Sequence, residues 1–217
     1  MLMPEYVKKL FRRLQHPKPK IPKYAPHLWI VSSYGKRPQL VPDPYERKLL
    51  DKKVTKRIQY IVETLLYYAH SVYPKMLRPT NEISRFQSKP TKYAEEKAKL
   101  LLDYTSTYPN VVICYRASDM VLQVDSDAAY ITMIEEISCY AEHLYLSDWP
   151  SPWTLKHTPR TNGPIHTECK TIRNVVSSSE EVETCGTFNN LKTAIGIKPD
   201  LITLEHNQPA TPLKTDN

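Results

Sequence analysis

The hydrophobic pattern of this chain changes its period near residue 110, and this change limits the folds that the chain can adopt. Before that point, apolar residues recur every three or four positions, as on one face of a helix. After it, they alternate with polar residues in short runs that are typical of strands. A helical stretch at 178–197 and a last strand-like run at 211–216 follow. Antiparallel strands, a helix and a returning strand predict an α/β layer fold.

We divide the chain into three regions on this basis. Residues 1–47 hold a basic amphipathic helix and a proline-rich extended linker, 48–109 are helical, and 110–217 form a mixed sheet with a flanking helix. The expected helices are 5–15, 48–72, 78–87, 91–108 and 178–197. The expected strands are 111–115, 121–127, 138–147, 163–169 and 211–216. In the last helix, the residues expected to face inward are Val182, Cys185, Phe188, Leu191 and Ile195.

The charge of the chain favours a polyanionic partner. The net charge is +7 and the estimated pI is about 9.1, with basic residues crowded into 8–23 and 47–57. Nucleic acid is the simplest such partner, although a modest excess of lysine also serves solubility. No apolar run approaches the roughly 18 residues of a membrane span, and the first residues do not resemble a signal peptide. We therefore expect an intracellular protein, cytoplasmic or nuclear and not secreted, without a membrane partner. The sequence does not identify which proteins, if any, it binds.

The four cysteines do not have the spacing of a zinc finger. His166 and Cys169 form a single H-x-x-C without a second pair. We interpret all four cysteines as free thiols in a reducing compartment, without structural zinc.

Three acids occur in three different local settings. Asp127 ends an alternating run, Glu183 follows the start of a helical pattern, and Asp216 ends the last strand-like run. A strand, a helix and a strand that each supply one carboxylate suit a divalent-metal site for phosphodiester hydrolysis. Asp125 shares the strand face of Asp127 and is an alternative first ligand, as Glu181 is to Glu183. Acids are also common at strand ends and helix starts, because solvent and the helix dipole favour them there.

Six short segments carry a resemblance through their order and spacing. They are 64–69 (TLLYYA), 81–86 (NEISRF), 98–104 (AKLLLDY), 126–130 (SDAAY), 176–183 (VSSSEEVE) and 215–217 (TDN). Together they resemble the end of a Copia-type LTR retrotransposon polyprotein over nearly the whole chain. The first three look like the helical stretch after the reverse transcriptase palm. The last three look like the acidic strand ends and helix start of a ribonuclease H-like domain.

The resemblance implies a thumb-like helical connection at 48–109 and a truncated ribonuclease H-like domain at 110–217. It implies hydrolysis of RNA in RNA–DNA hybrids with two Mg²⁺, with Asp127, Glu183 and Asp216 as catalytic and metal-binding residues. The palm and a fourth metal-binding acid have no residues here, so weak or absent activity is expected. Glu63 and Glu142 stand where the family usually has glycine, which adds a charge and a Cβ at a close-packed site.

The alternative function is a non-catalytic nucleic-acid-binding module that uses the basic helical half. In the enzyme interpretation, further basic residues of the second half could contact phosphates. These are Lys156, His157, Arg160, Lys170 and Arg173.

Overall fold

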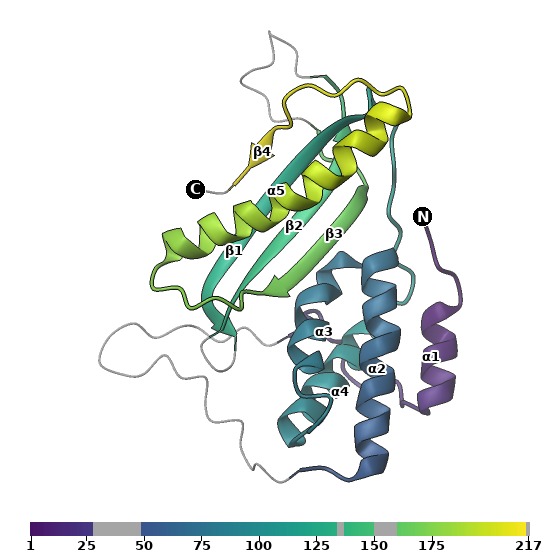
Figure 1. Ribbon diagram of the computed structural model, residues 1–217. Helices are drawn as coiled ribbons and strands as arrows, with labels where there is room; N and C mark the ends of the chain where they lie inside the picture. Colours follow the sequence, from purple (N-terminus) through teal and green to yellow (C-terminus); the bar gives the residue numbers. More distant parts are fainter. Residues whose placement is uncertain (28–48, 134–136, 150–159, 216–217) are drawn as a thin grey trace. The chain divides into compact units, whose positions relative to one another are not determined.

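The computed structural model describes residues 1–27, 49–133, 137–149 and 160–215 (Figure 1). The chain divides into two compact units, and each is described by itself. The first comprises Met1–Ile113 with Met133–Glu136, and the second comprises Cys114–Thr132 and Ile137–Asn217.

The first unit is helical, as its period predicts. The central helix α2 begins after Asp51, whose carboxylate accepts a hydrogen bond from the amide of Val54 at 2.8 Å. The apolar stripe of α2 is buried against the neighbouring helices, and Leu65 and Ala69 are fully buried. The elements of this unit are α1 (Tyr6–Leu14), α2 (Lys52–Ser71), the short 3₁₀ helix η1 (Pro74–Met76), α3 (Leu77–Ser84) and α4 (Lys92–Thr107).

Helix α1 packs beside α2 through aromatic contacts. The ring of Tyr6 stacks on that of Tyr68 with centroids 5.4 Å apart, and its hydroxyl donates to the carbonyl oxygen of Thr64 at 3.0 Å. Glu63 is exposed on α2, so its charge does not lie in a close-packed site as the sequence suggested. This is because Glu63 points away from the stripe that carries Val62 and Leu65.

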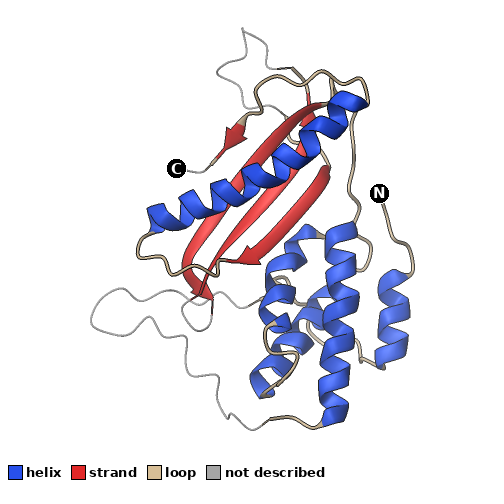
Figure 2. Cartoon of the chain, in the orientation of Figure 1, coloured by secondary structure: helices blue, strands red, loops and turns tan. Residues whose placement is uncertain are grey.

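The second unit is a mixed four-stranded sheet with strand order β3-β2-β1-β4 (Figure 2). Strands β2 and β3 are antiparallel, whereas β4 runs parallel to β1. Helix α5 connects β3 to β4 and lies across one face of the sheet. An α/β architecture is thus confirmed. The elements are β1 (Val121–Met133), β2 (Ile137–Ser147), β3 (Pro164–Thr171), α5 (Ser179–Thr203) and β4 (Leu213–Lys214).

Several boundaries differ from those predicted. Strand β1 continues beyond residue 127 to Met133, so Asp127 lies within the strand and not at its end as expected. The run 111–115 is not a strand: Val112 makes only an isolated bridge to Leu2, and Tyr115 is half exposed. Apolar residues alone do not make a strand where no neighbouring strand is available for pairing. Helix α5 also continues through Pro199, which the sequence placed in a loop, to Thr203.

The buried face of α5 agrees with the predicted one at Val182 but not further along the helix. Phe188, Leu191 and Ile195 are exposed to different degrees, with Ile195 at 69%. The buried positions instead recur every four residues along much of the helix, because small side chains allow the helix to approach the sheet closely. These positions are Val182, Gly186, Asn190, Ala194 and Leu201.

Candidate functional site

Helix α5 holds strand β1 at two neighbouring points. At Gly186, an added Cβ would lie 3.2 Å from the Cβ of Ala128 and 3.9 Å from the carbonyl oxygen of Asp127. One turn later, the side-chain amide of Asn190 donates to the hydroxyl oxygen of Ser126 at 2.7 Å. The residues directly before and after Asp127 therefore both contact α5, and these contacts hold the backbone of Asp127 against the helix.

The structure places two of the three predicted acids on these segments. Asp127 is exposed on β1. Glu183 is half buried on α5, one turn before Gly186, and therefore comes from the part of the helix that lies beside the backbone of Asp127. Asp216, the third predicted acid, lies outside the described residues.

The alternative first acid, Asp125, lies among side chains of β2. Burial lowers the pKa of His143, and the charge of Asp125 partly offsets this effect. Burial likewise raises the pKa of Tyr145, and Asp125 adds to that rise. Asp125 is half buried next to these two side chains, whereas Asp127 is exposed.

The alternative second acid, Glu181, takes part in capping the N-terminus of α5. Its two carboxylate oxygens accept hydrogen bonds from the amide (2.7 Å) and hydroxyl (3.0 Å) of Ser177, and these bonds lower its pKa. Its own amide donates to the hydroxyl oxygen of the N-cap residue Ser178 at 3.2 Å. Glu181 therefore acts as part of a variant capping box.

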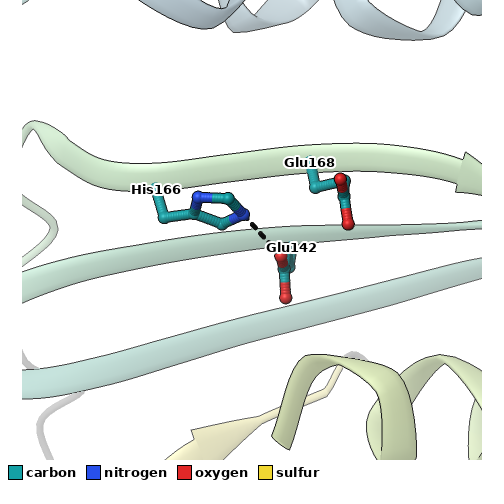
Figure 3. Close-up of side chains that lie close together, drawn as sticks. All are labelled: Glu142, His166 and Glu168. Atoms are coloured by element: carbon teal, nitrogen blue, oxygen red, sulfur yellow. Dashed lines mark ion pairs between the residues drawn. The ribbon is translucent and has the colours of Figure 1, made fainter. Parts of the chain in front are cut away.

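A second cluster of potential ligands lies on β2 and β3, where the sequence predicted none. Glu142, His166 and Glu168 each offer one ligand atom, and these atoms all lie within 4.8 Å of one another (Figure 3). The Nε2 of His166 is 2.9 Å from an oxygen of Glu142. The antiparallel register places Glu168 directly opposite Glu142 and His166 opposite Leu144, so all three ligands share the face that α5 covers.

The cluster is strongly asymmetric in its exposure. The side chain of Glu142 is 0% exposed, whereas that of His166 is 38% exposed. The pKa of Glu142 is raised to about 7. Burial is the largest cause of this rise, and the nearby charge of Glu168 contributes to it. The hydroxyl of Thr193 and the ammonium of Lys170 offset only part of this rise. The protein interior therefore favours the neutral form of this carboxyl group over its ionised form.

One signal in the sequence pointed towards this cluster. Glu142 interrupts the inward-facing positions of an alternating run that includes Leu144, and this was visible without a structure. Its partners were not visible, because they depend on the register between β2 and β3. His166 and Cys169 are three residues apart on β3 and therefore face opposite sides, so they do not form a ligand pair.

The basic residues proposed to contact phosphates have varied positions. Lys156 and His157 lie outside the described residues. Lys170 is paired with Glu168 at 2.5 Å, whereas Arg160 and Arg173 are exposed.

Comparison with known proteins adds no assignment. The chain matches no protein-family model, no curated protein and no solved structure. Within the described residues, every helix is too short or too polar to cross a membrane.

Proposed function

We propose that the second unit is a ribonuclease H-like domain derived from a Copia-type retrotransposon polyprotein. In this proposal Asp127, Glu183 and Asp216 hold two Mg²⁺ ions, and the ancestral reaction is hydrolysis of RNA in an RNA–DNA hybrid. The present chain retains little of that activity.

The parallel register of β1 and β4 carries this proposal. Val124 pairs with Leu213, and Asp125 pairs with Lys214. Asp127 is the second residue after Asp125, and Asp216 is the second after Lys214. Each acid is thus two residues further along the sequence than a residue of this paired segment, and we take this correspondence as support for a shared site.

The direction of Glu183 on α5 also supports the proposal. Asn190 follows Glu183 by two helical turns and therefore lies on nearly the same stripe of the helix. Asn190 contacts Ser126 of β1 and the backbone of Ala141 on β2, so this stripe faces the β1–β2 part of the sheet. Glu181, by contrast, is occupied by its hydrogen bonds to Ser177.

The chemistry follows from the preferences of the ion. Two Mg²⁺ ions about 3.5–4 Å apart supply an activated water and stabilise the leaving oxygen of an in-line displacement. Mg²⁺ prefers oxygen ligands and keeps several waters, so a few carboxylates suffice. Asp127 would bridge the two ions, with Glu183 reaching in from the helix and Asp216 from the adjacent strand.

A departure from the family's sequence pattern in the sheet supports the proposed loss of activity. Glu142 stands where the resemblance implies glycine, and its buried carboxyl lies under α5 in the same sheet that positions Asp127. A buried carboxyl at this position is costly, and the conformation of β2 and β3 must accommodate it.

Mn²⁺, a paramagnetic substitute for Mg²⁺, tests the proposal even if turnover is very slow. We expect Mn²⁺ to broaden the NMR signals of residues around Asp127 and Glu183. Asp127→Asn and Glu183→Gln should abolish this broadening, whereas Glu181→Gln and Glu142→Gln should preserve it. In parallel, any Mg²⁺-dependent cleavage of an RNA–DNA hybrid should disappear in Asp127→Asn. Broadening that is absent, or that survives in Asp127→Asn, would contradict the proposal.

A second candidate function is favoured by the junction of α1 and α2. The guanidinium of Arg13 lies 4.2 Å from the ring centroid of Tyr60, and Arg57 donates to the carbonyl oxygen of Leu14 at 2.7 Å. These contacts bring the two basic segments together within the first unit. Exposed lysines continue on both helices, namely Lys8, Lys9, Lys52, Lys53 and Lys56.

This second candidate is a non-catalytic module that binds the nucleic-acid backbone. Replacing Lys52 and Lys53 with glutamine should weaken binding and reduce its dependence on salt, with a slope lower by up to about two. The matched change at Lys92 and Lys99 of α4 should have a smaller effect. Equal effects of the two sets would show that binding reflects net charge and not this junction.

A further inference from the structure

Glu142 has an unusual environment for a carboxylate. Its side chain is 0% exposed, and neither of its oxygens accepts a hydrogen bond of normal geometry from the described residues. Buried carboxylates in proteins are normally satisfied by hydrogen bonds, by a paired cation or by a metal ion. The imidazole of His166 lies close to one oxygen, and the hydroxyl of Thr193 is a neighbouring neutral donor whose bond to the carboxylate does not reach normal geometry. The positive groups near this buried acid are thus the partly exposed imidazole of His166 and the surface ammonium of Lys170, which pairs with Glu168.

We propose that Glu142, His166 and Glu168 bind one Zn²⁺ ion and thereby link β2 to β3. The three ligand atoms already lie within 4.8 Å of one another and come from adjacent strands (Figure 3). A tetrahedral Zn²⁺ with ligands at about 2.0–2.2 Å brings its ligand atoms to roughly 3.3–3.6 Å from one another. About 1 Å of side-chain movement closes the site, and the partly exposed His166 and Glu168 can supply it.

The mixture of ligands selects zinc over magnesium. Imidazole nitrogen is a good ligand for Zn²⁺, whereas Mg²⁺ prefers an octahedral shell made of oxygen atoms. One histidine and two carboxylates supply three protein ligands and leave a fourth position for water. The exposed side of His166 gives the ion a route from solvent to the buried Glu142.

Lys170 is the cation that competes for this site. Its ammonium lies 2.5 Å from an oxygen of Glu168, and it also lowers the pKa of Glu142 slightly. The Lys170 side chain is 59% exposed, so it can turn into solvent when a metal ion binds. Removing its charge should therefore strengthen zinc binding, which a purely structural role of the cluster does not predict.

The first test is a calorimetric titration of the metal-free chain with Zn²⁺. We expect a 1:1 event assigned to this cluster, weakened at least tenfold in Glu142→Gln and in His166→Gln. The exposed Glu205, on the chain just after α5, supplies the matched control Glu205→Gln, which should leave the affinity unchanged. Millimolar Mg²⁺ should not displace the bound ion.

The second test compares a variant that keeps all three ligands with one that lacks a ligand but keeps the fold. Lys170→Gln should tighten Zn²⁺ binding several-fold, and saturating Zn²⁺ should raise the Tm of the wild-type chain by several degrees. Glu142→Gln should remain folded, because it replaces a buried acid by an isosteric amide, and its Tm should not respond to Zn²⁺. This variant separates loss of the site from loss of the fold.

The exposed thiol of Cys114 is a rival zinc ligand. Binding that persists in both Glu142→Gln and His166→Gln but disappears in Cys114→Ser would overturn the proposal, as would the absence of any binding. The site uses none of the three acids assigned to Mg²⁺. Asp127→Asn should therefore retain zinc binding, so failure of one proposal leaves the other intact.

Discussion

Gly186 on α5 lies directly against Tyr140 on β2, with only 3.1 Å between the Cβ of the tyrosine and the place where a Cβ on Gly186 would be. The same position is 3.2 Å from Ala128 on β1. The helix thus rests on two strands at one residue without a side chain. The backbone of Asp127 on β1 adjoins this contact, and Glu183 lies one turn before Gly186 on α5, so the two segments that carry these candidate acids meet here.

Gly186→Ala should destabilise the second unit by about 1–3 kcal/mol, because the new methyl group meets two Cβ atoms that belong to the sheet. The gain in helix propensity, about 1 kcal/mol, offsets only part of this. Gly196→Ala is the matched control in the same helix, since nothing lies within 4 Å of its added Cβ. Urea denaturation should show the control to be more stable than the wild type. Equal effects at the two glycines would contradict the close contact.

Asn190→Ala should cost about 2–4 kcal/mol in the free energy of unfolding. The Asn190 amide is fully buried and donates to Ser126 at 2.7 Å and to the carbonyl oxygen of Ala141 at 3.0 Å, so its removal leaves two acceptors unsatisfied and a small cavity. Asn189→Ala, which loses a local bond to Cys185 on the same helix, should cost less than about 1 kcal/mol. Chemical denaturation of both variants gives the comparison.

Glu142 should make the stability of the metal-free protein depend on pH. Its pKa in the folded chain is raised to about 7 from an ordinary value of 4.5, first by burial and then by Glu168. Below pH 4.5 the group is protonated in both states and imposes no penalty. As the pH rises from 4.5 to 7, the unfolded state ionises first, so stability is lost; above 7 the loss is constant.

The full loss is roughly 3 kcal/mol, obtained from the 2.5-unit difference between those two pKa values. Glu142→Gln should therefore be about as stable as the wild type near pH 4 and more stable near pH 8, with a chelator present throughout. Denaturation midpoints across this range measure the difference. A wild-type minus variant difference that does not change with pH would contradict the raised pKa.

The pair of His16 and Asp103 should stabilise the first unit. The Nε2 of His16 lies 2.7 Å from an oxygen of Asp103, and the side chains are only 6% and 12% exposed. Asp103→Ala leaves the buried imidazole without this partner and should cost about 2–3 kcal/mol. Asp103→Asn keeps an acceptor of the same shape and should cost less. Equal losses in thermal or urea unfolding would indicate that packing, and not this polar contact, is what matters.

The sequence by itself determined which segments are helices and which are strands wherever the apolar period is long. Residues 52–71 illustrate this, because a 3.6-residue repeat specifies one buried face regardless of its neighbours. The same local information located the start of α5, where Ser178 and Glu181 satisfy the first free amides.

Only the tertiary structure decided which side of α5 is buried and which strands are neighbours. The large apolar residues Phe188 and Ile195 were expected inside, yet both are exposed, and α5 approaches the sheet most closely at Gly186, where there is little room for a Cβ. The cluster of Glu142, His166 and Glu168 likewise depends on the register of two strands. Pairing register and interlayer distance are properties of two segments together, so neither can be obtained from the pattern of one segment alone.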